Sequence, residues 1–125
     1  MPEPIRIVLV EDNQVFREAL ELLLEMRADI DVVASGGDGT EAVGACTAYE
    51  PDVVVMDYRL PGLDGVQATS AVVTACPGVA VVGLTASANK TEMQALLEAG
   101  AVECLTKDEA LDTITAAIIR AAGRT

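Results

Sequence analysis

Val53-Val54-Val55-Met56 is apolar at every position and is followed directly by the acidic residue Asp57. A strand with one face in water alternates apolar and polar side chains, so an unbroken apolar run predicts a strand that is covered on both faces. Strands of this kind belong to parallel sheets that lie between two layers of helices. The stretch therefore predicts an α/β fold, and it places a carboxylate at the end of a buried strand.

The rest of the chain repeats a unit in which a short β-branched run is followed by an amphipathic stretch. The expected strands are residues 5–10, 30–34, 53–56, 80–84 and 102–106. The expected helices are residues 14–27, 40–49, 66–75, 90–99 and 109–121. Five such units predict one doubly wound α/β domain that spans residues 1–125.

Some of the expected helices begin with a side-chain acceptor that is followed by Glu or Gln at the spacing of a capping box. These pairs are Asp38 with Glu41, Asp64 with Gln67, and Asn89 with Glu92. Helical spacing in the first helix predicts a buried stripe of Phe16, Leu20, Leu23 and Leu24. The same spacing predicts a solvent-exposed face with Arg17, Glu18, Glu21 and Glu25.

The composition excludes several classes of protein. Eight basic and twenty acidic residues give a net charge of -12, so we expect no direct binding of nucleic acid by this domain. The chain has no histidine, which excludes a Ser-His-Asp triad, zinc sites with imidazole ligands and a phosphohistidine carrier. Three cysteines without a C-x-x-C pair predict reduced, buried thiols. The sequence shows no signal peptide or membrane-spanning run, and we expect a cytoplasmic protein without a membrane partner.

Charged and hydroxyl side chains follow four of the expected strands. Glu11 and Asp12 come after the first strand, and the third, fourth and fifth strands lead to Asp57, Thr85 and Lys107. The carboxyl ends of parallel strands meet at one edge of the sheet, so these side chains are expected to lie together. Crowded carboxylates need a cation, and an all-oxygen site suits Mg²⁺. In such a site Asp57 is a candidate nucleophile towards a phosphoryl group.

Two other interpretations of these segments are open. Asp12 with Asn13 could serve as the cap of the first helix. The glycine-rich residues 37–42, Gly-Asp-Gly-Thr-Glu-Ala, fit the G-x-G-x-x-A pattern of a dinucleotide-binding loop. A bound dinucleotide would leave the charged residues at the strand ends unexplained, so this pattern is the weaker prediction.

Four motifs stand in order along the chain: Val8-Leu9-Val10-Glu11-Asp12, Val55-Met56-Asp57 on to Asp64-Gly65, Leu84-Thr85-Ala86, and Gly100-Ala101 on to Thr106-Lys107. With these motifs the chain resembles the receiver domain of response regulators along nearly its whole length. The resemblance implies a flavodoxin-like (β/α)5 fold with strand order 2-1-3-4-5. It also implies a protein that is not an enzyme and that receives a phosphoryl group on Asp57 from a partner histidine kinase.

The same resemblance implies a role for each residue of the site. Mg²⁺ would be held by Glu11, Asp12, Asp57 and the backbone carbonyl of Arg59. Lys107 would pair with Asp57 at rest and with the phosphoryl group afterwards. Thr85 would turn its hydroxyl towards a phosphoryl oxygen.

Three further stretches, residues 16–20, 57–62 and 107–108, resemble the branch of the family that carries a LuxR-type helix-turn-helix output domain. The resemblance implies that the protein regulates transcription and reaches DNA only through such an output domain, of which this sequence shows no sign. Additional apolar residues on the first and fifth helices predict a homodimer. They are Val15, Ala19, Leu22, Met26, Ala116, Ala117 and Ile119.

One residue departs from the family pattern. Cys104 stands where receivers commonly have an aromatic residue that moves inward on activation. A thiol has much less area to bury, which predicts weaker coupling between the site and the face of the fourth helix and fifth strand. The alternative function is an interaction module that docks without being phosphorylated, although the presence of Asp57, Thr85 and Lys107 together favours phosphorylation.

Overall fold

Five parallel strands form one sheet in the order β2-β1-β3-β4-β5. The computed structural model describes residues 3–124, and within them the strands are β1 (Ile5–Val10), β2 (Ile30–Gly36), β3 (Val53–Asp57), β4 (Ala80–Thr85) and β5 (Glu103–Thr106). The helices are α1 (Gln14–Glu25), α2 (Glu41–Tyr49), α3 (Gly65–Ala75), α4 (Lys90–Ala99) and α5 (Leu111–Ala121). None of these helices is long and apolar enough to cross a lipid bilayer. The predicted doubly wound α/β fold, with its strand order, is confirmed.

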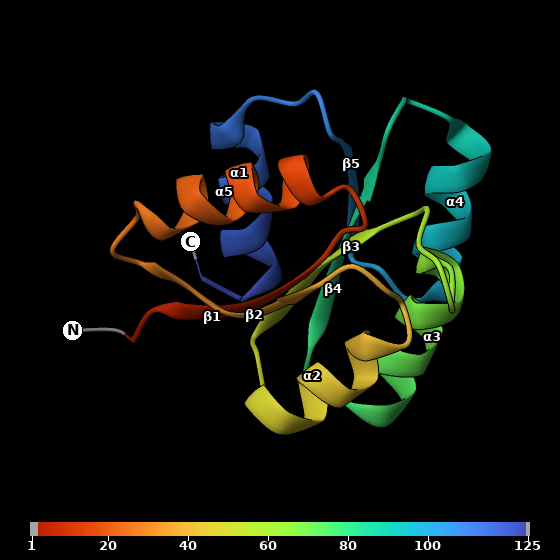
Figure 1. Cartoon of the computed structure of the whole chain (residues 1–125), viewed down its shortest axis with the longest axis horizontal. Helices are drawn as coiled ribbons and strands as arrows, with labels where there is room; N and C mark the ends of the chain where they lie inside the picture. The colour runs from red at the N-terminus through yellow and green to blue at the C-terminus, as the bar shows by residue number, and fades with distance from the viewer. Residues whose placement is uncertain (1–2, 125) are drawn as a thin grey trace.

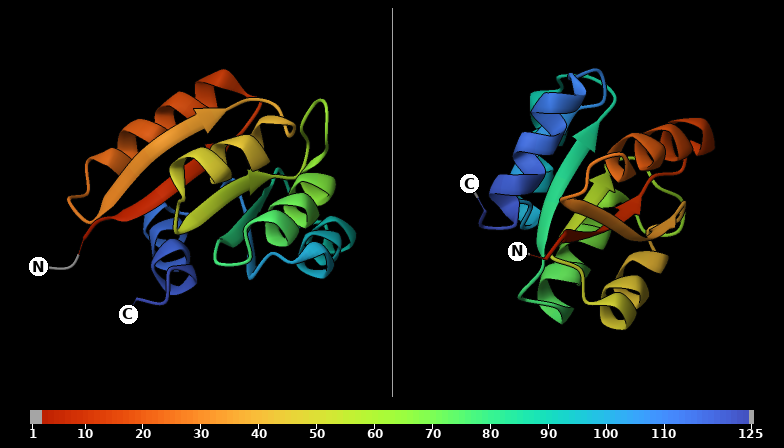
Figure 2. Two further views of the ribbon diagram at one scale, coloured as in Figure 1. Left: turned by 90° about the horizontal axis from the view of Figure 1, so that it is seen from below. Right: turned by 90° about the vertical axis from the view of Figure 1, so that its left-hand side faces the viewer.

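Helices cover both faces of the sheet (Figure 1). Helices α1 and α5 lie on one face, and α2, α3 and α4 lie on the other, as two further views show (Figure 2). In β3, Val53 and Val55 pack into the core on the α1 and α5 side. Val54 and Met56 pack into the core on the opposite side. All four side chains are fully buried, which explains why this central strand is apolar at every position.

Most element boundaries lie close to their predicted positions. Helix α1 ends at Glu25 rather than at residue 27, since Arg27 belongs to the following turn and forms an ion pair with Asp29 at 2.9 Å. Strand β2 runs on to Gly36 because it stays paired with the last residue of β1. Helix α5 begins at Leu111, after a turn at the end of β5.

Two of the three predicted helix caps are confirmed. Gln67 donates its backbone N–H to Asp64 Oδ1 at 2.8 Å and accepts from the Asp64 N–H at 3.1 Å, which completes a capping box at the start of α3. Asn89 accepts from the N–H of Glu92 at 3.1 Å at the start of α4. These bonds link residues three apart, which is why the sequence pattern predicts them.

The capping box predicted for Asp38 and Glu41 is wrong. Helix α2 has Thr40 at its N-cap, with no side-chain bond to the helix. The Asp38 carboxylate instead accepts from the N–H and the hydroxyl of Thr40, both at 2.8 Å. The acidic side chain therefore closes the turn before the helix, because it lies two residues before the N-cap position.

Helix α1 buries a narrower stripe than its periodicity predicts. Leu20 and Leu24 are buried and Phe16 is half-buried, but Leu23 is 42 % exposed. Leu23 lies at the rim of a hollow between α1 and α5, where no side chain covers it fully. Glu18 and Glu25 face water as predicted, but Arg17 and Glu21 are half-buried, Arg17 against the loop after β1.

Candidate functional site

The carboxyl ends of the strands bring the predicted site residues together at one edge of the sheet. Asp57 is the last residue of β3 and Thr85 is the last of β4, and these two strands pair in parallel. Glu11 follows β1, and Lys107 follows β5. The sheet therefore gathers residues from four separate parts of the chain.

The Lys107 ammonium connects two buried carboxylates. Its Nζ lies 2.6 Å from Glu11 Oε1 and 3.1 Å from Asp57 Oδ2. Glu11 is fully buried and Asp57 is 2 % exposed, so water screens these ion pairs little. The same Nζ lies 5.1 Å from the centroid of the Phe16 ring, within the range of a cation–π contact. Sequence reasoning missed this contact, since periodicity places Phe16 in the core and does not connect it to Lys107.

Three carboxylates form an acidic cluster beside this ammonium. Glu11, Asp12 and Asp57 each offer an oxygen, and these oxygens all lie within 4.8 Å of one another. Asp12 is exposed whereas the other two are buried, so the cluster opens to solvent on one side. Mg²⁺ prefers oxygen ligands and usually keeps several waters. The donor set therefore fits the predicted metal.

Burial and crowding change the ionisation of Asp57. Burial, followed by the neighbouring Glu11 carboxylate, raises the pKa of Asp57 from 3.8 to about 7, although Lys107 opposes this shift. Burial lowers the pKa of Lys107, but the two carboxylates outweigh that effect and raise it overall. Lys107 is therefore charged near neutral pH. A cation beside Asp57 would favour the ionised carboxylate.

Asn13, and not Asp12, caps helix α1. The Asn13 side-chain oxygen accepts from the N–H of Phe16 at 3.0 Å. The Asn13 N–H donates to Glu11 Oε2, also at 3.0 Å. Asn13 therefore caps the helix, and Asp12 belongs to the acidic cluster.

The turn after β3 holds the main chain of Asp57 against helix α3. The Gly65 N–H donates to the carbonyl of Tyr58 at 2.9 Å. A Cβ on Gly65 would lie only 2.1 Å from the Asp57 carbonyl oxygen, so this close approach requires glycine. Gly65 is the first residue of α3, and its lack of a side chain determines how closely Asp57 approaches this helix.

The hydroxyl of Thr85 contacts the loop that follows β4. It donates to the carbonyl of Ser87 at 2.7 Å and thereby ties this loop to the end of the strand. The hydroxyl would have to leave Ser87 before it could donate to a group on Asp57. Thr85 is thus at the predicted position with a different partner in this structure.

The side chain of Arg59 is directed to helix α4. Its Nη2 pairs with Glu92 at 3.1 Å, and its guanidinium lies 6.0 Å from the centroid of the Tyr58 ring. These contacts leave the backbone carbonyl of Arg59 as the group expected at the metal. That role stays a prediction.

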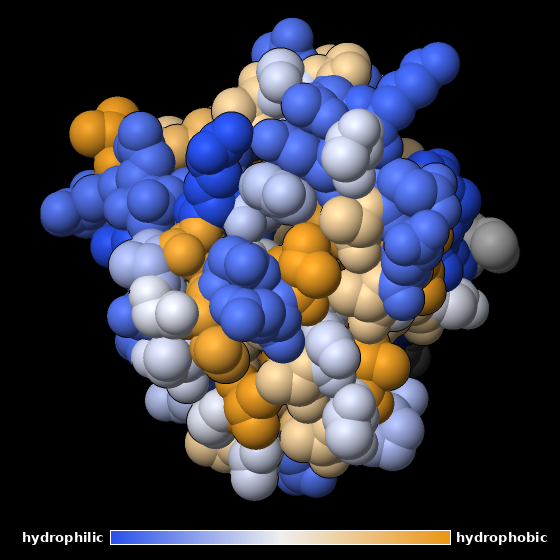
Figure 3. Space-filling model, turned by 90° about the vertical axis from the view of Figure 1, so that its right-hand side faces the viewer, coloured by the Kyte–Doolittle hydropathy of each residue, from blue (hydrophilic) through white to orange (hydrophobic). Residues whose placement is uncertain are grey.

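Cys104 packs beside the middle of β4. It lies opposite Gly83, and a Cβ on that glycine would be 2.9 Å from the Cys104 sulfur and 2.8 Å from Leu96 of α4. Burial raises the pKa of the Cys104 thiol to about 11, so it is protonated near neutral pH. The outer surface on this side mixes hydrophilic and hydrophobic residues (Figure 3). The thiol thus acts as a small packing group. Of the three thiols predicted to be buried, only Cys46 is buried, whereas Cys76 and Cys104 are half-buried.

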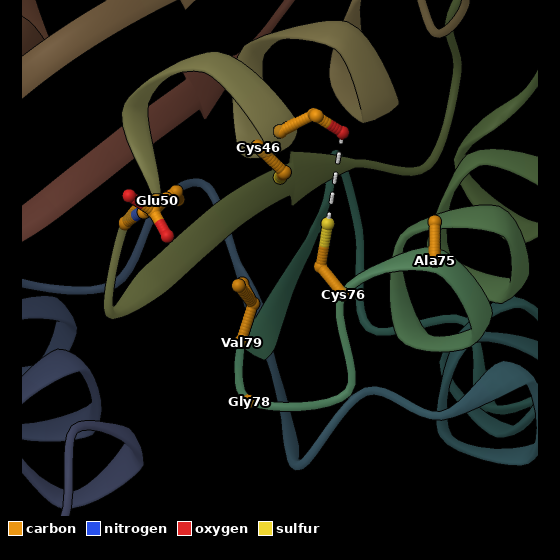
Figure 4. A pocket seen from close by; sticks show the side chains of 8 residues that line it. Cys46, Glu50, Ala75, Cys76, Gly78 and Val79 are labelled. Carbon is orange, nitrogen blue, oxygen red and sulfur yellow. Dashed lines mark hydrogen bonds between the residues drawn. The ribbon is translucent and has the colours of Figure 1, made fainter.

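A second hollow lies at the other end of the sheet, between the ends of α2 and α3 (Figure 4). Its volume is about 400 Å³, and its lining includes Cys46 and Cys76. Burial raises the pKa of Cys46 to about 11, and the Cys76 sulfur lies 4.0 Å from the Thr47 hydroxyl. A protonated thiol is a poor nucleophile, so Cys46 gives this hollow little reactivity.

One protein-family model matches the sequence, and it is consistent with the fold and with the site at the ends of the strands. The model described as "Response regulator receiver domain" matches residues 7–119. The chain belongs to the response-regulator receiver family. In this receiver, the glycine-rich residues 37–42 form the turn that leads into α2 and the start of that helix.

Most of the similar curated relatives are transcriptional regulators, although two are protein-glutamate methylesterases. The transcriptional regulatory protein LnrK of Bacillus subtilis is 36% identical over 115 residues, which are 92% of this chain and 52% of LnrK. The transcriptional regulatory protein NarL of Mycobacterium tuberculosis is 32% identical over 118 residues, which are 94% of this chain and 55% of NarL. The chain therefore spans about half the length of these relatives.

Solved receiver domains have the same fold. The signal receiver domain of NarL from Mycobacterium tuberculosis has a TM-score of 0.92 at 32% identity, with 98% of each chain covered. The receiver domain of the sensor histidine kinase PA1611 from Pseudomonas aeruginosa has a TM-score of 0.85 at 31% identity, with 96% of this chain and 98% of that chain covered. The PA1611 structure has a magnesium ion coordinated in its active-site cleft.

Proposed function

We propose that this receiver accepts a phosphoryl group on Asp57 from a histidine of a partner kinase, with Mg²⁺, and thereby controls an output domain or partner protein that regulates transcription. One observation carries the proposal. Oxygens of Glu11, Asp12 and Asp57 converge within 4.8 Å of one another, and Lys107 contacts two of these residues. The transcriptional role is supported by the regulators LnrK and NarL, of which the chain matches about half.

The acidic cluster would hold the metal ion. The proposed ligands are Glu11, Asp12, Asp57 and the backbone carbonyl of Arg59. A bound Mg²⁺ would supply positive charge that offsets the charge of the phosphoryl oxygens. Lys107 would supply a second positive charge, because its ammonium already contacts Asp57. The magnesium ion in the related PA1611 receiver supports this assignment.

The proposed reaction transfers the phosphoryl group between two residues. A carboxylate oxygen of Asp57 forms a P–O bond while the P–N bond to the kinase histidine breaks. The electron pair of the broken bond stays on the histidine nitrogen. Because these 125 residues contain no histidine, the donor histidine lies outside them. The raised pKa of Asp57 makes the reaction depend on positive charge that keeps the carboxylate ionised.

Phosphorylation would change the loop after β4. The new phosphoryl oxygens would attract the Thr85 hydroxyl, which now donates to Ser87. Loss of this bond would release the loop that leads into helix α4. A ligand shifts an equilibrium only by its different affinity for two states, and the exchange of partner at Thr85 is such a difference. The small side chain of Cys104 would limit how far the change spreads along β5.

The test of the proposed function is phosphorylation of the chain by acetyl phosphate, followed by intact mass measurement. The wild type should gain one phosphoryl group with Mg²⁺ and none with a chelator. Asp57→Asn should gain none, because its amide is not nucleophilic, whereas the exposed control Asp31→Asn should behave like the wild type. Modification that persists in Asp57→Asn would contradict the assignment. A wild type that is never modified would favour the alternative of an unphosphorylated docking module.

We also propose that the exposed face of α1 mediates a homodimer of the receiver. The additional apolar residues predicted on α5 do not extend this face, because Ala117 is fully buried and Ile119 packs against the core. Val15, Leu22 and Met26 are 79%, 67% and 77% exposed, which is unusual for large apolar side chains grouped on one helix. Leu22→Lys should raise the dimer dissociation constant about tenfold, measured by sedimentation with the phosphoryl mimic beryllofluoride. Leu97→Lys, at an exposed leucine of α4, is the control. A wild type that is monomeric with and without the mimic would contradict the prediction.

A further inference from the structure

Arg17 connects the first turn of α1 to the acidic cluster. Its side chain is half-buried, and Nη1 donates to the main-chain carbonyl of Glu11 at 2.6 Å. Arg27 and Arg120 pair with the carboxylates of Asp29 and Glu103, whereas Arg17, like Arg6, donates to a main-chain carbonyl. A backbone carbonyl as partner means that Arg17 holds the position of the chain at Glu11.

Gly37 provides the space in which this guanidinium lies. A Cβ on Gly37 would be 2.9 Å from Arg17 Nη1, 3.6 Å from the Glu11 carbonyl oxygen and 3.8 Å from the Asp12 Cα. The backbone of Gly37 is outside the left-handed region, so its conformation does not require glycine. A side chain at this position would therefore displace the guanidinium of Arg17 from its place beside the Glu11 carbonyl.

The segment that Arg17 holds carries two of the three clustered carboxylates. The Glu11 N–H donates to the Gly36 carbonyl at 2.9 Å, and Glu11 Oε2 accepts from the Asn13 N–H at 3.0 Å. The bond from Arg17 satisfies the carbonyl of the same residue. Glu11 is thus held at its N–H, its carbonyl and its side chain, directly before the exposed Asp12.

We propose that Arg17 is a positioning residue of the metal site. By fixing the main chain at Glu11 and Asp12, it keeps their carboxylates close to Asp57 before a cation binds. Like charges repel, so an unrestrained segment would move apart in the absence of metal. Groups that orient metal ligands commonly change metal affinity about 10- to 100-fold when they are removed. This inference rests on the proposed binding of Mg²⁺ to the cluster.

A purely electrostatic role of Arg17 predicts the opposite result. Removal of a positive charge near three carboxylates would strengthen the binding of a cation. Positioning predicts weaker binding after the same substitution. The direction of the change in Mg²⁺ affinity therefore distinguishes the two explanations.

The experiment measures the Mg²⁺ dissociation constant by isothermal titration calorimetry, at a temperature where every variant is folded. Arg17→Met removes the guanidinium and keeps the apolar stem. Gly37→Ala keeps the positive charge and places a methyl group against Nη1, so it tests the contact separately. Arg27→Met is the matched control, because it removes an arginine that pairs with Asp29. Amide chemical shifts of residues 11–13 in the metal-free protein report the position of the segment directly.

We expect the dissociation constant to rise about 10-fold in Arg17→Met and in Gly37→Ala, and to stay within about 2-fold of the wild type in Arg27→Met. The amide shifts of residues 11–13 should change in the first two variants only. An unchanged or lower dissociation constant in both site variants would overturn the inference while leaving the proposed function intact. A wild type that does not bind Mg²⁺ would overturn both.

Discussion

Lys107→Met should make the metal-free protein about 3 kcal/mol less stable than the wild type near pH 8. The Lys107 ammonium lies 2.6 Å from the carboxylate of Glu11 and 3.1 Å from that of Asp57, and both carboxylates are buried. Methionine keeps an apolar stem beside Phe16 but leaves these two negative charges without a cation. We place the effect at the lower end for a broken buried pair, because the lysine side chain is 20% exposed.

Thermal unfolding in a chelator checks this prediction. The midpoint should fall by roughly 10 °C, and the loss should be smaller near pH 5, where Asp57 with its raised pKa can bind a proton. Lys90→Met, which removes an exposed lysine at the start of α4, is the matched control and should leave the midpoint unchanged. Equal midpoints for Lys107→Met and Lys90→Met would show that the ion pairs contribute nothing to stability.

Asp57→Asn should have the opposite effect and stabilise the metal-free protein near pH 8 by about 2 kcal/mol. Burial and the Glu11 carboxylate raise the pKa of Asp57 from 3.8 to about 7, so the folded state binds this proton more tightly than the unfolded chain does. The resulting stability is present in full below pH 3.8 and is lost as the pH rises through about 7. Asparagine has no charge to bury, and its side-chain oxygen can still accept from Lys107.

The advantage of Asp57→Asn should therefore depend on pH. Its midpoint should exceed that of the wild type by roughly 6 °C near pH 8. The difference should shrink as the pH falls through about 7 and should vanish only below pH 3.8, where Asp57 is protonated in the folded and the unfolded chain. Both proteins are measured in a chelator, with Asp31→Asn as the control for loss of an exposed carboxylate. An advantage that is constant between these pH values would mean that ionisation of Asp57 is not its cause.

Local patterns in the sequence predict much of the fold. The apolar run at residues 53–56 predicts a strand covered on both faces, and each of its side chains is fully buried. The pairs Asp64 with Gln67 and Asn89 with Glu92 predict helix starts, because their bonds join residues three apart. Such bonds form whenever the local backbone has the conformation of a helix start. Where the local backbone differs, as in the turn at Asp38, the same pattern predicts the wrong partner.

The candidate site was predictable as a set of residues because parallel strands have their carboxyl ends at one edge. This rule places Glu11, Asp57 and Lys107 together before any distance is known. It does not determine which atoms meet. The 2.6 Å approach of Lys107 to Glu11, the contact with Phe16 and the bond from Thr85 to Ser87 depend on how the loops pack.

The position of Arg17 depends on tertiary packing, and the sequence pattern does not predict it. Helical periodicity assigns Arg17 to the solvent face, because it considers only the position of the residue on its own helix. The loop after β2 lies against that face, and Gly37 leaves the space for the guanidinium beside the Glu11 carbonyl. Contacts between segments far apart in the chain depend on the complementary shapes of all the packed elements, whereas strands, helices and caps follow from neighbouring residues. The amino-acid pattern thus determines the elements and the residues at the edge of the sheet, and packing in three dimensions determines which of them touch.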